Sequence, residues 1–263
     1  MPSNLEAGSR IDRYEVVREI GQGGMAVVYE VRHVELGSRH ALKVMRPGPP
    51  ELADRLIQEG RVQAGLRHPN LVAVTDVVVV DRRPCLVLEL VDGAPLDEWL
   101  LAHPDCTDET RRRIAAQICT AVAHAHAHGT IHRDLKPANL LVLGDERAPW
   151  VKVADFGLAK WLHAPNPGVT RAGLPLGTPR YMAPEQIHDG STIDARTDVF
   201  AIGCILADLW GRPAFDEKAI PDLFDDIVEG RFQVPEAAPP DVAAAIRAAL
   251  QPNLERRTGS VAA

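Results

Sequence analysis

Three side chains suited to phosphate chemistry lie within nine residues, in the stretch Ile131–Asn139. Asp134 can accept a proton from a hydroxyl group, Lys136 can hold a phosphate oxygen, and Asn139 can offer a carbonyl oxygen to a hard cation. Pro137 is excluded from a helix interior or a central strand, so the stretch is expected to form a rigid loop. Catalytic residues are commonly placed on such loops.

A lysine and a glutamate earlier in the chain are expected to pair. Lys43 interrupts the apolar run of a strand predicted at Arg39–Met45, which a side chain reaching out to water would also explain. Intervals of four, three, four and three residues separate Leu52, Leu56, Glu59, Gln63 and Leu66, which predicts a helix with Glu59 on its inward face. A buried carboxylate needs a partner, and Lys43 is the obvious candidate.

Two turns could serve a nucleotide. Gly21–Gly24 separates strands predicted at 14–20 and 27–31, and glycines let backbone N–H groups approach phosphates without a side chain in the way. An ordinary hairpin turn is the alternative. Asp155 ends a third hairpin, predicted from strands at 140–143 and 150–154, where an acid is also common in turns.

Together these motifs resemble those of protein kinases. His132–Asn139 matches His-Arg-Asp-Leu-x-x-x-Asn at every fixed position. The Lys-Pro pair within it, and Gly177–Glu185, are similar to the serine/threonine branch. The motifs follow in the family's order from about residue 14 to 258: Gly21–Val28, Lys43, Glu59, His132–Asn139, Asp155–Gly157, Ala183–Glu185 and Asp198. Among protein kinases, these motifs look most like those of the bacterial Hanks-type, or eukaryotic-like, serine/threonine protein kinases.

The resemblance implies a role for each of these positions. Asp134, Lys136, Lys43, Glu59 and Thr178 are expected to be catalytic. Asn139 and Asp155 are expected to bind Mg²⁺, with Mn²⁺ as a substitute. The residues expected to bind ATP are Ile20, Gly21, Gln22, Gly23, Gly24, Ala26, Val28, Ala41, Lys43, Leu88, Glu89, Val91 and Leu141.

Further roles come from the same resemblance. Asp198 is expected to anchor the catalytic loop from below, and also to cap the helix predicted at 198–210. Thr170 is a candidate phosphosite whose phosphate Arg133 could bind. Glu185 is expected to pair with an arginine, with Arg256 preferred over Arg257.

The fold class implied is α+β, with the bilobal protein-kinase architecture. Residues 1–13 are expected to be an N-terminal extension. Residues 14–91 should form a small lobe of antiparallel sheet with one main helix, and 92–263 a larger, mainly helical lobe. The family's last helix should run some ten residues further, so the larger lobe is expected to be incomplete or part of a longer protein. Its helices are predicted at 96–101, 108–128, 198–210, 220–228 and 240–250.

Two departures leave other functions open. Ala26 replaces the third glycine of the phosphate loop, which is expected to reduce loop mobility without abolishing nucleotide binding. Gln63 replaces a small or apolar residue. With the short C-terminus, these are the only support for a pseudokinase or a nucleotide-binding scaffold. A small-molecule kinase of related fold is a further alternative, but that function would not explain the presence of the segment Gly177–Glu185.

Composition narrows the environment and the partners. The 263 residues are 46% hydrophobic, and the formal net charge of −7 argues against a nucleic-acid or anionic membrane surface. The four cysteines form no Cys-x-x-Cys pair, and no apolar run is long enough to span a membrane. We therefore expect a cytoplasmic kinase domain, or the cytosolic part of a longer, membrane-anchored protein. Its partners would be proteins with serine or threonine acceptors, and a second copy for trans-autophosphorylation.

Overall fold

The computed structural model describes residues 5–23, 26–46, 57, 60–81, 83–156, 179–188 and 193–261. The chain divides into two compact units: residues 1–67 with 71–92, and residues 68–70 with 93–263. The division falls after Asp92 and moves residues 68–70 out of the first lobe expected from the sequence. The reason is Asn70, whose side chain donates to the carbonyl of Val151 at 2.8 Å and whose own carbonyl accepts from the amide of Val153 at 2.8 Å.

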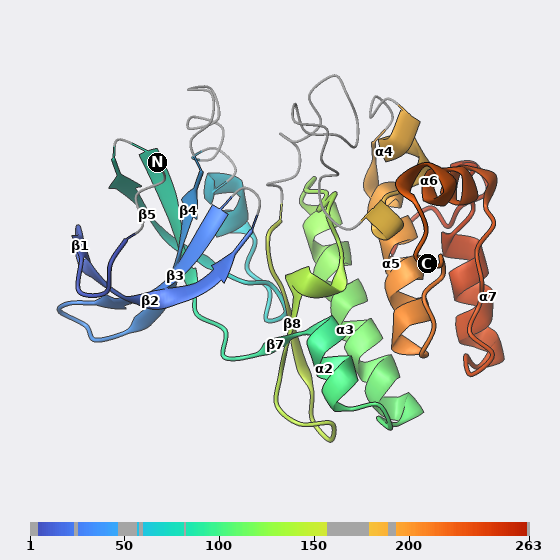
Figure 1. Cartoon of the computed structure of the whole chain (residues 1–263), viewed down its shortest axis with the longest axis horizontal. Coiled ribbons are helices and arrows are strands. Elements are labelled where there is room, and N and C mark those ends of the chain that lie inside the picture. Colours follow the sequence, from blue (N-terminus) through green and yellow to red (C-terminus); the bar gives the residue numbers. More distant parts are fainter. Residues whose placement is uncertain are drawn as a thin grey trace. The chain divides into compact units, whose positions relative to one another are not determined.

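The first unit contains a six-stranded antiparallel sheet, in the order β1-β2-β3-β4-β6-β5 (Figure 1). Its strands are β1 (Arg10–Ile11), β2 (Tyr14–Gln22), β3 (Ala26–His33), β4 (Arg39–Met45), β5 (Val74–Val80) and β6 (Arg83–Glu89). Strand β1 lies in the stretch expected to be an extension, and it pairs with β2 at the edge of the sheet. The predicted hairpins are confirmed, although β2 and β3 run closer to the glycine turn than expected.

Alternation along the strands gives the sheet two different faces. One face carries a buried apolar cluster. Its members include Tyr14, Tyr29, Leu42, Val44 and Val87. The opposite face therefore carries the residues between them in sequence, including Lys43 between Leu42 and Val44.

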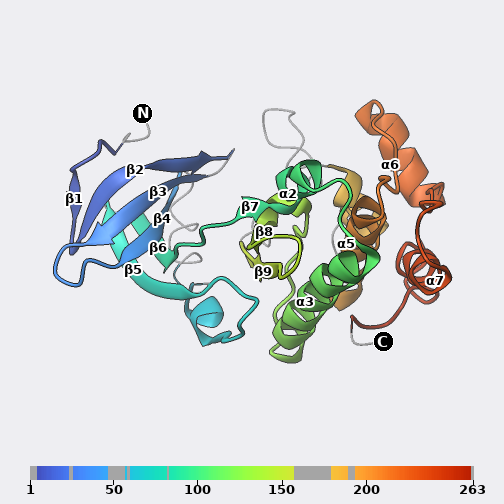
Figure 2. The same cartoon turned by 90° about the horizontal axis from the view of Figure 1, so that it is seen from below.

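The second unit combines helices with a three-stranded sheet in the order β7-β8-β9. Its helices are α2 (Leu96–Ala102), α3 (Asp108–Ala127), α4 (Pro184–His188), α5 (Ala195–Leu209), α6 (Ile220–Glu229) and α7 (Pro240–Ala249). Its strands are β7 (Ala94–Pro95), β8 (Leu140–Leu143) and β9 (Trp150–Val153), and its described residues include the 3₁₀ turns η1 (Pro137–Asn139) and η3 (Pro179–Tyr181). Helix α5 packs against both α3 and α7 (Figure 2).

Helix α5 is buried along nearly its whole length, as its apolar sequence predicts. The prediction that Asp198 caps it is wrong. The cap is Asp194, whose carboxylate accepts from the amide of Arg196 at 2.8 Å, so the helix begins three residues earlier. Gly203 lets α7 approach closely, because a β-carbon there would lie 2.9 Å from the β-carbon of Ala249.

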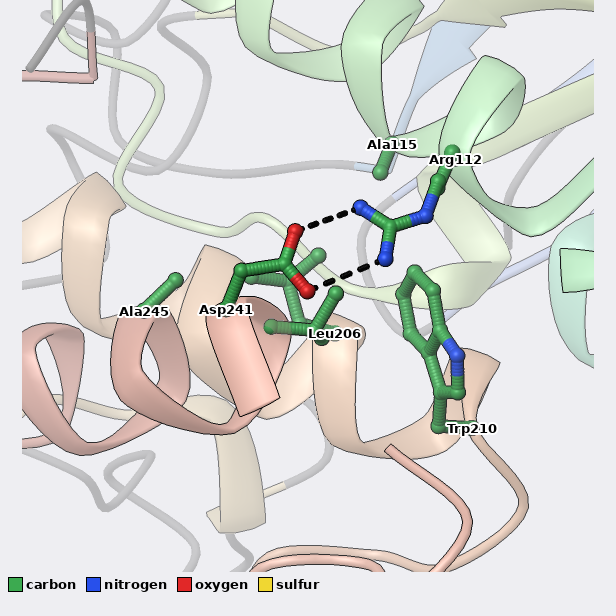
Figure 3. A pocket seen from close by; sticks show the side chains of 7 residues that line it. Arg112, Ala115, Leu206, Trp210, Asp241 and Ala245 are labelled. Carbon is green, nitrogen blue, oxygen red and sulfur yellow. Dashed lines mark hydrogen bonds and ion pairs between the residues drawn. The ribbon is translucent and has the colours of Figure 1, made fainter. Parts of the chain in front are cut away.

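A pocket of about 240 Å³ opens between α3, α5 and α7 (Figure 3). Arg112 of α3 forms one side through a two-pronged ion pair with Asp241 of α7, at 2.7 and 3.0 Å. Arg112 also binds Asp108 at 2.6 Å, and the indole of Trp210 donates to Asp108 at 2.9 Å. The remaining lining is aliphatic: Ala115, Leu206, Val242 and Ala245.

All four cysteines are free thiols. Cys85 lies in the core of the first unit, and Cys106, Cys119 and Cys204 lie in the second. Burial raises the pKa of Cys85 and of Cys119 to about 11, and raises that of Cys204 as well. These thiols are therefore poor nucleophiles at neutral pH.

Candidate active site

The loop that follows α3 gathers its polar side chains around Asp134. Lys136 donates to Oδ2 of Asp134 at 2.8 Å. Asn139 donates from Nδ2 to the backbone carbonyl of Asp134 at 2.8 Å and to the same carboxylate oxygen at 3.3 Å. Pro137 starts a short 3₁₀ turn, which brings Asn139 back over the residues before it. The result is a carboxylate held in one orientation by a cation and an amide.

His132 connects this loop to the strand that leads to Asp155. Its Nε2 lies 2.8 Å from the carbonyl of Ala154, and its Nδ1 accepts from the amide of Asp134 at 3.3 Å. The network therefore places the ring proton on Nε2. The ring is fully buried and packs against Phe156 with 4.5 Å between centroids. One imidazole thus fixes both the residue before Asp155 and the backbone of Asp134.

A buried carboxylate supports the loop from α5. Asp198 accepts from the amide of His132 at 2.8 Å and from that of Arg133 at 2.8 Å. His126 of α3 lies 2.7 Å from Oδ2 of Asp198. Arg133 adopts a left-handed backbone with φ of 70°, which a non-glycine residue holds only when its surroundings compensate. Asp198 thus anchors the loop, as the resemblance implied.

Asn139 and Asp155, the residues expected to bind Mg²⁺, are brought near each other by the backbone. The amide of Ala154 donates to the backbone carbonyl of Asn139 at 2.8 Å, which brings the two positions together. Because the nitrogen of the Asn139 side chain is bonded to Asp134, its oxygen is the atom that can face a cation. Among the described residues no three His, Cys, Asp or Glu side chains converge on one point. Two oxygen donors fit a cation that takes its other ligands from water and from substrate phosphates.

In the first unit, four of the expected nucleotide-binding residues share one face of the sheet. Lys43 pairs across strands with Val28 and with Leu86, while Ala41 pairs with Leu88. Directly opposed residues project to the same face, and so do residues two apart along one strand. Val28, Ala41, Lys43, Leu86 and Leu88 therefore lie together, opposite the apolar cluster. Lys43 is buried there.

The helical residues 60–65 lie on this same face. A β-carbon on Gly60 would come within 2.7 Å of Leu86, which is the cross-strand partner of Lys43. Only glycine tolerates so close an approach without displacing Leu86. Glu59, the expected partner of Lys43, lies outside the described residues. Gln63 is buried in the described part of the helix.

The other predicted residues are distributed between the two units. Gly21 and Gln22 pair with Val28 and Val27 at the end of the β2–β3 hairpin, and the amide of Gly23 donates to the carbonyl of Ala26 at 2.9 Å. Ile20 belongs to β2 and Glu89 to β6, Val91 lies in the first unit, and Leu141 belongs to β8 in the second. Gly24, Thr170 and Thr178 lie outside the described residues.

The segment that begins at Pro179 is tied to the helices of the second unit. Tyr181 donates to Asp208 of α5 at 2.7 Å, and Arg180 donates to the phenol oxygen at 2.8 Å. Burial is the main cause that raises the pKa of both Tyr181 and Asp208 above their ordinary values. Sequence reasoning missed Asp208, because only the fold brings it to Tyr181.

Glu185 forms a buried ion pair with Arg257, at 2.8 and 3.0 Å. The preference for Arg256 is therefore wrong. Thr197 donates to the same carboxylate at 2.8 Å, so several hydrogen bonds compensate the buried charges. His126 and Gln186 are further residues that sequence reasoning missed.

No helix of the described residues has the length and apolar character needed to cross a membrane.

The comparisons with known proteins point to one family. The model of the protein kinase domain matches residues 14–261. Serine/threonine-protein kinase Pkn1 of Myxococcus xanthus is 40% identical over 249 residues, which are 93% of this chain and 35% of the relative. Serine/threonine-protein kinase PknB of Mycolicibacterium smegmatis is 38% identical over 78% of this chain and 33% of its own length. The chain thus spans about a third of these relatives.

A solved structure agrees in fold. The crystal structure of Rad53 1-466 in complex with AMP-PNP matches with a TM-score of 0.78 and 26% identity, over 95% of this chain and 63% of that one. The antiparallel sheet of the first unit and the helical second unit are therefore those of the protein kinase fold. On the family match and these relatives, the chain belongs to the protein kinase family.

Proposed function

We propose that this chain is the catalytic domain of a serine/threonine protein kinase, which transfers the γ-phosphoryl group of ATP to a protein hydroxyl. The observation that carries the proposal is the carboxylate of Asp134, held at 2.8 Å by Lys136 and backed by Asn139. A positioned base beside a cation suits a reaction that depends on orientation and charge stabilisation. The names of the similar bacterial kinases support serine and threonine as acceptors.

In this proposal Asp134 orients the acceptor hydroxyl. Its carboxylate takes the proton as the hydroxyl oxygen forms a bond to the γ-phosphorus and the bond from that phosphorus to ADP breaks. Lys136 neutralises charge on the transferred group. Asn139 and Asp155 hold Mg²⁺, or Mn²⁺ in its place, which when bound neutralises charge on the phosphates.

The face of the first sheet that carries Lys43 is assigned to ATP. Val28, Ala41 and Leu88 supply an apolar surface for the base, and Lys43 supplies a cation for the phosphates. Gly21 and Gly23 carry no side chain, so phosphates can approach the backbone of this turn closely. Glu59 and Lys43 are assigned as an ion pair, and Thr178 is assigned to the acceptor site.

Regulation completes the proposal. Thr170 is a candidate site of activating phosphorylation, added by a second copy of the chain, with Arg133 as a partner for the phosphate. The substrates are proteins rather than nucleic acids, and the domain works in the cytoplasm, by itself or as part of a longer membrane-anchored protein. An unmodified Thr170 in fully active protein would exclude the phosphosite.

The direct test is transfer of the ATP γ-phosphate, with Mg²⁺, to the chain itself and to a generic basic protein. Asp134→Ala should lower transfer at least about 100-fold, because it removes the base. Asp105→Ala, at an exposed aspartate, is the matched control and should retain activity. Peptide mapping would show whether the transferred phosphate lies on serine or threonine residues, and whether Thr170 is one of them. Mg-ATP binding without any transfer by the parent chain would instead favour the pseudokinase.

A further inference from the structure

Gln186 links helix α4 to the catalytic loop through its side-chain amide. Nε2 donates to the backbone carbonyl of Arg133 at 2.8 Å, and Oε1 accepts from the amide of Ala183 at 2.9 Å. Since a carbonyl can only accept and a backbone amide can only donate, the orientation of this side chain is unambiguous. The residue is 3% exposed, so water does not compete freely for these bonds.

The carbonyl that Gln186 binds belongs to the peptide joining Arg133 to Asp134. The amide of the same peptide donates to His132 at 3.3 Å, so hydrogen bonds hold the peptide on both edges. On the other side of Arg133, its own amide is held by Asp198 at 2.8 Å. Arg133 has φ of 70°, and the orientation of this peptide determines where the side chain of Asp134 starts.

We propose that Gln186 is a positioning residue for Asp134, an inference that rests on the proposed kinase function. A left-handed residue returns to a commoner backbone conformation unless its neighbours over-determine it. Asp198 fixes the peptide before Arg133, and Gln186 fixes the peptide after it. A shift of about 1 Å in a catalytic group can cost about 100-fold in rate. The donated hydrogen bond therefore makes the geometry of the base depend on the segment Ala183–Gln186.

Two substitutions of Gln186 separate this role from simple packing. Gln186→Met keeps the length and removes both hydrogen bonds. Gln186→Glu keeps an acceptor for Ala183, but an ionised carboxylate cannot donate to Arg133. Once protonated, the substituted carboxyl group can donate again, and burial raises the pKa of such a group. Gln233→Glu is the matched control, because Gln233 also donates a side-chain hydrogen bond, to Asp216, but that bond is exposed to solvent.

The expected result is a loss of kcat of about tenfold or more at pH 8 in both Gln186 variants, with KM for ATP changed less than about twofold. The ratio of kcat in Gln186→Glu to kcat in the parent should rise as the pH falls from about 8 to 6, and the ratio for Gln186→Met should stay flat. Amide hydrogen exchange in residues 131–139 should be faster in both variants. Rates are expressed per folded molecule from a denaturation curve.

Three outcomes would overturn the inference: unchanged kcat in both variants, a loss in Gln186→Glu that does not respond to pH, or unchanged exchange in residues 131–139. The parent chain is measured beside them. If the parent transfers no phosphate, the proposed function fails on its own account. Hydrogen exchange, which needs no activity, then decides whether Gln186 holds this peptide.

Discussion

The carboxylate of Asp198 occupies a site where two backbone amides converge. Those of His132 and Arg133 both donate to it at 2.8 Å, and its side chain is 1% exposed. An amide side chain of the same shape would offer one acceptor and turn a donor toward the second N–H. Side-chain chemistry at Asp198, rather than volume, is therefore what this position requires.

Asp198→Asn should lower the free energy of unfolding by about 2–4 kcal/mol, because it leaves a buried N–H group facing another donor. Urea denaturation measures the loss. Asp194→Asn, at the cap of the same helix, is the control and should cost less than about 1 kcal/mol, since asparagine caps helices well. Equal losses in the two variants would contradict the role given to Asp198.

Arg257 and Glu185 form a pair with almost no exposure, at 0% and 4%. Arg257→Met should cost about 3–5 kcal/mol, because it leaves Glu185 buried without its cation. Adding Glu185→Met should recover part of that loss. Arg256→Met is the neighbouring control, and denaturant unfolding should show little change for it. A double variant less stable than Arg257→Met would show that the charge left behind is not the cause.

Helix α7 meets α3 and α5 around the pocket drawn in Figure 3, and the contact is incompletely filled. The ion pair of Arg112 with Asp241 spans the same contact. It lowers the pKa of Asp241 to about 2, mainly through the hydrogen bonds from Arg112. That contribution is present above about pH 3.8 and disappears as the pH falls through 2. Both side chains are largely exposed, so near neutral pH the aliphatic lining offers the larger gain.

Ala245→Leu should raise the free energy of unfolding by about 0.5–1 kcal/mol, since Ala245 lines the pocket and a larger apolar side chain can fill it. Ala244→Leu is the matched control on α7, because both alanines are exposed and only Ala245 lines the pocket. Thermal or urea unfolding of the two variants compares them directly. A destabilised Ala245→Leu would mean that the helices do not leave usable space.

His124 of helix α3 lies against two other histidine rings, both tilted relative to its own. His124 lies 5.1 Å from His68 and 4.4 Å from His128, measured between ring centroids. Burial, and then the neighbouring His124, lower the pKa of His68 below 6.5. The unfolded chain therefore binds this proton more readily than the folded one. The contribution to stability is complete above pH 6.5 and is lost as the pH falls below it.

His124→Phe keeps an aromatic ring at this position and removes the electrostatic effect of His124 on His68. We expect its melting temperature to fall less steeply than that of the parent between about pH 7 and 5, because only the burial of His68 remains. Melting curves across this range give both slopes. Parallel slopes in parent and variant would exclude His124 as a cause.

Across the two units, local patterns could be read from the sequence, and long-range partners could not. The strands of the first sheet follow from alternation, and Asp134, Lys136 and Asn139 follow from residue type and spacing. The cap of α5 was misassigned because Asp194 and Asp198 both precede the same apolar run. Backbone hydrogen bonds decide between them, and these depend on the packed fold.

The same limit applies to pairs that meet only after folding. Arg256 and Arg257 are adjacent in the sequence. Only the packing of this segment against α5 directs Arg257 toward Glu185. Gln186 has no distinguishing spacing, because its partner is the carbonyl of Arg133, 53 residues away and independent of side-chain type. Backbone acceptors leave no signature in the residues that carry them.

The buried thiols allow the opening of each unit to be measured separately. Cys85 lies in the first unit and Cys204 in the second, at 0% and 3% exposure, so an alkylating reagent reaches them only when that unit opens. Timed labelling followed by mass spectrometry should therefore give a separate labelling rate for each unit within one chain. If Cys85 is labelled faster than Cys204, the first unit opens more often; equal rates would mean that both open in one cooperative event. ATP added before the reagent should lower the labelling rate of the cysteine in whichever unit ATP binding stabilises.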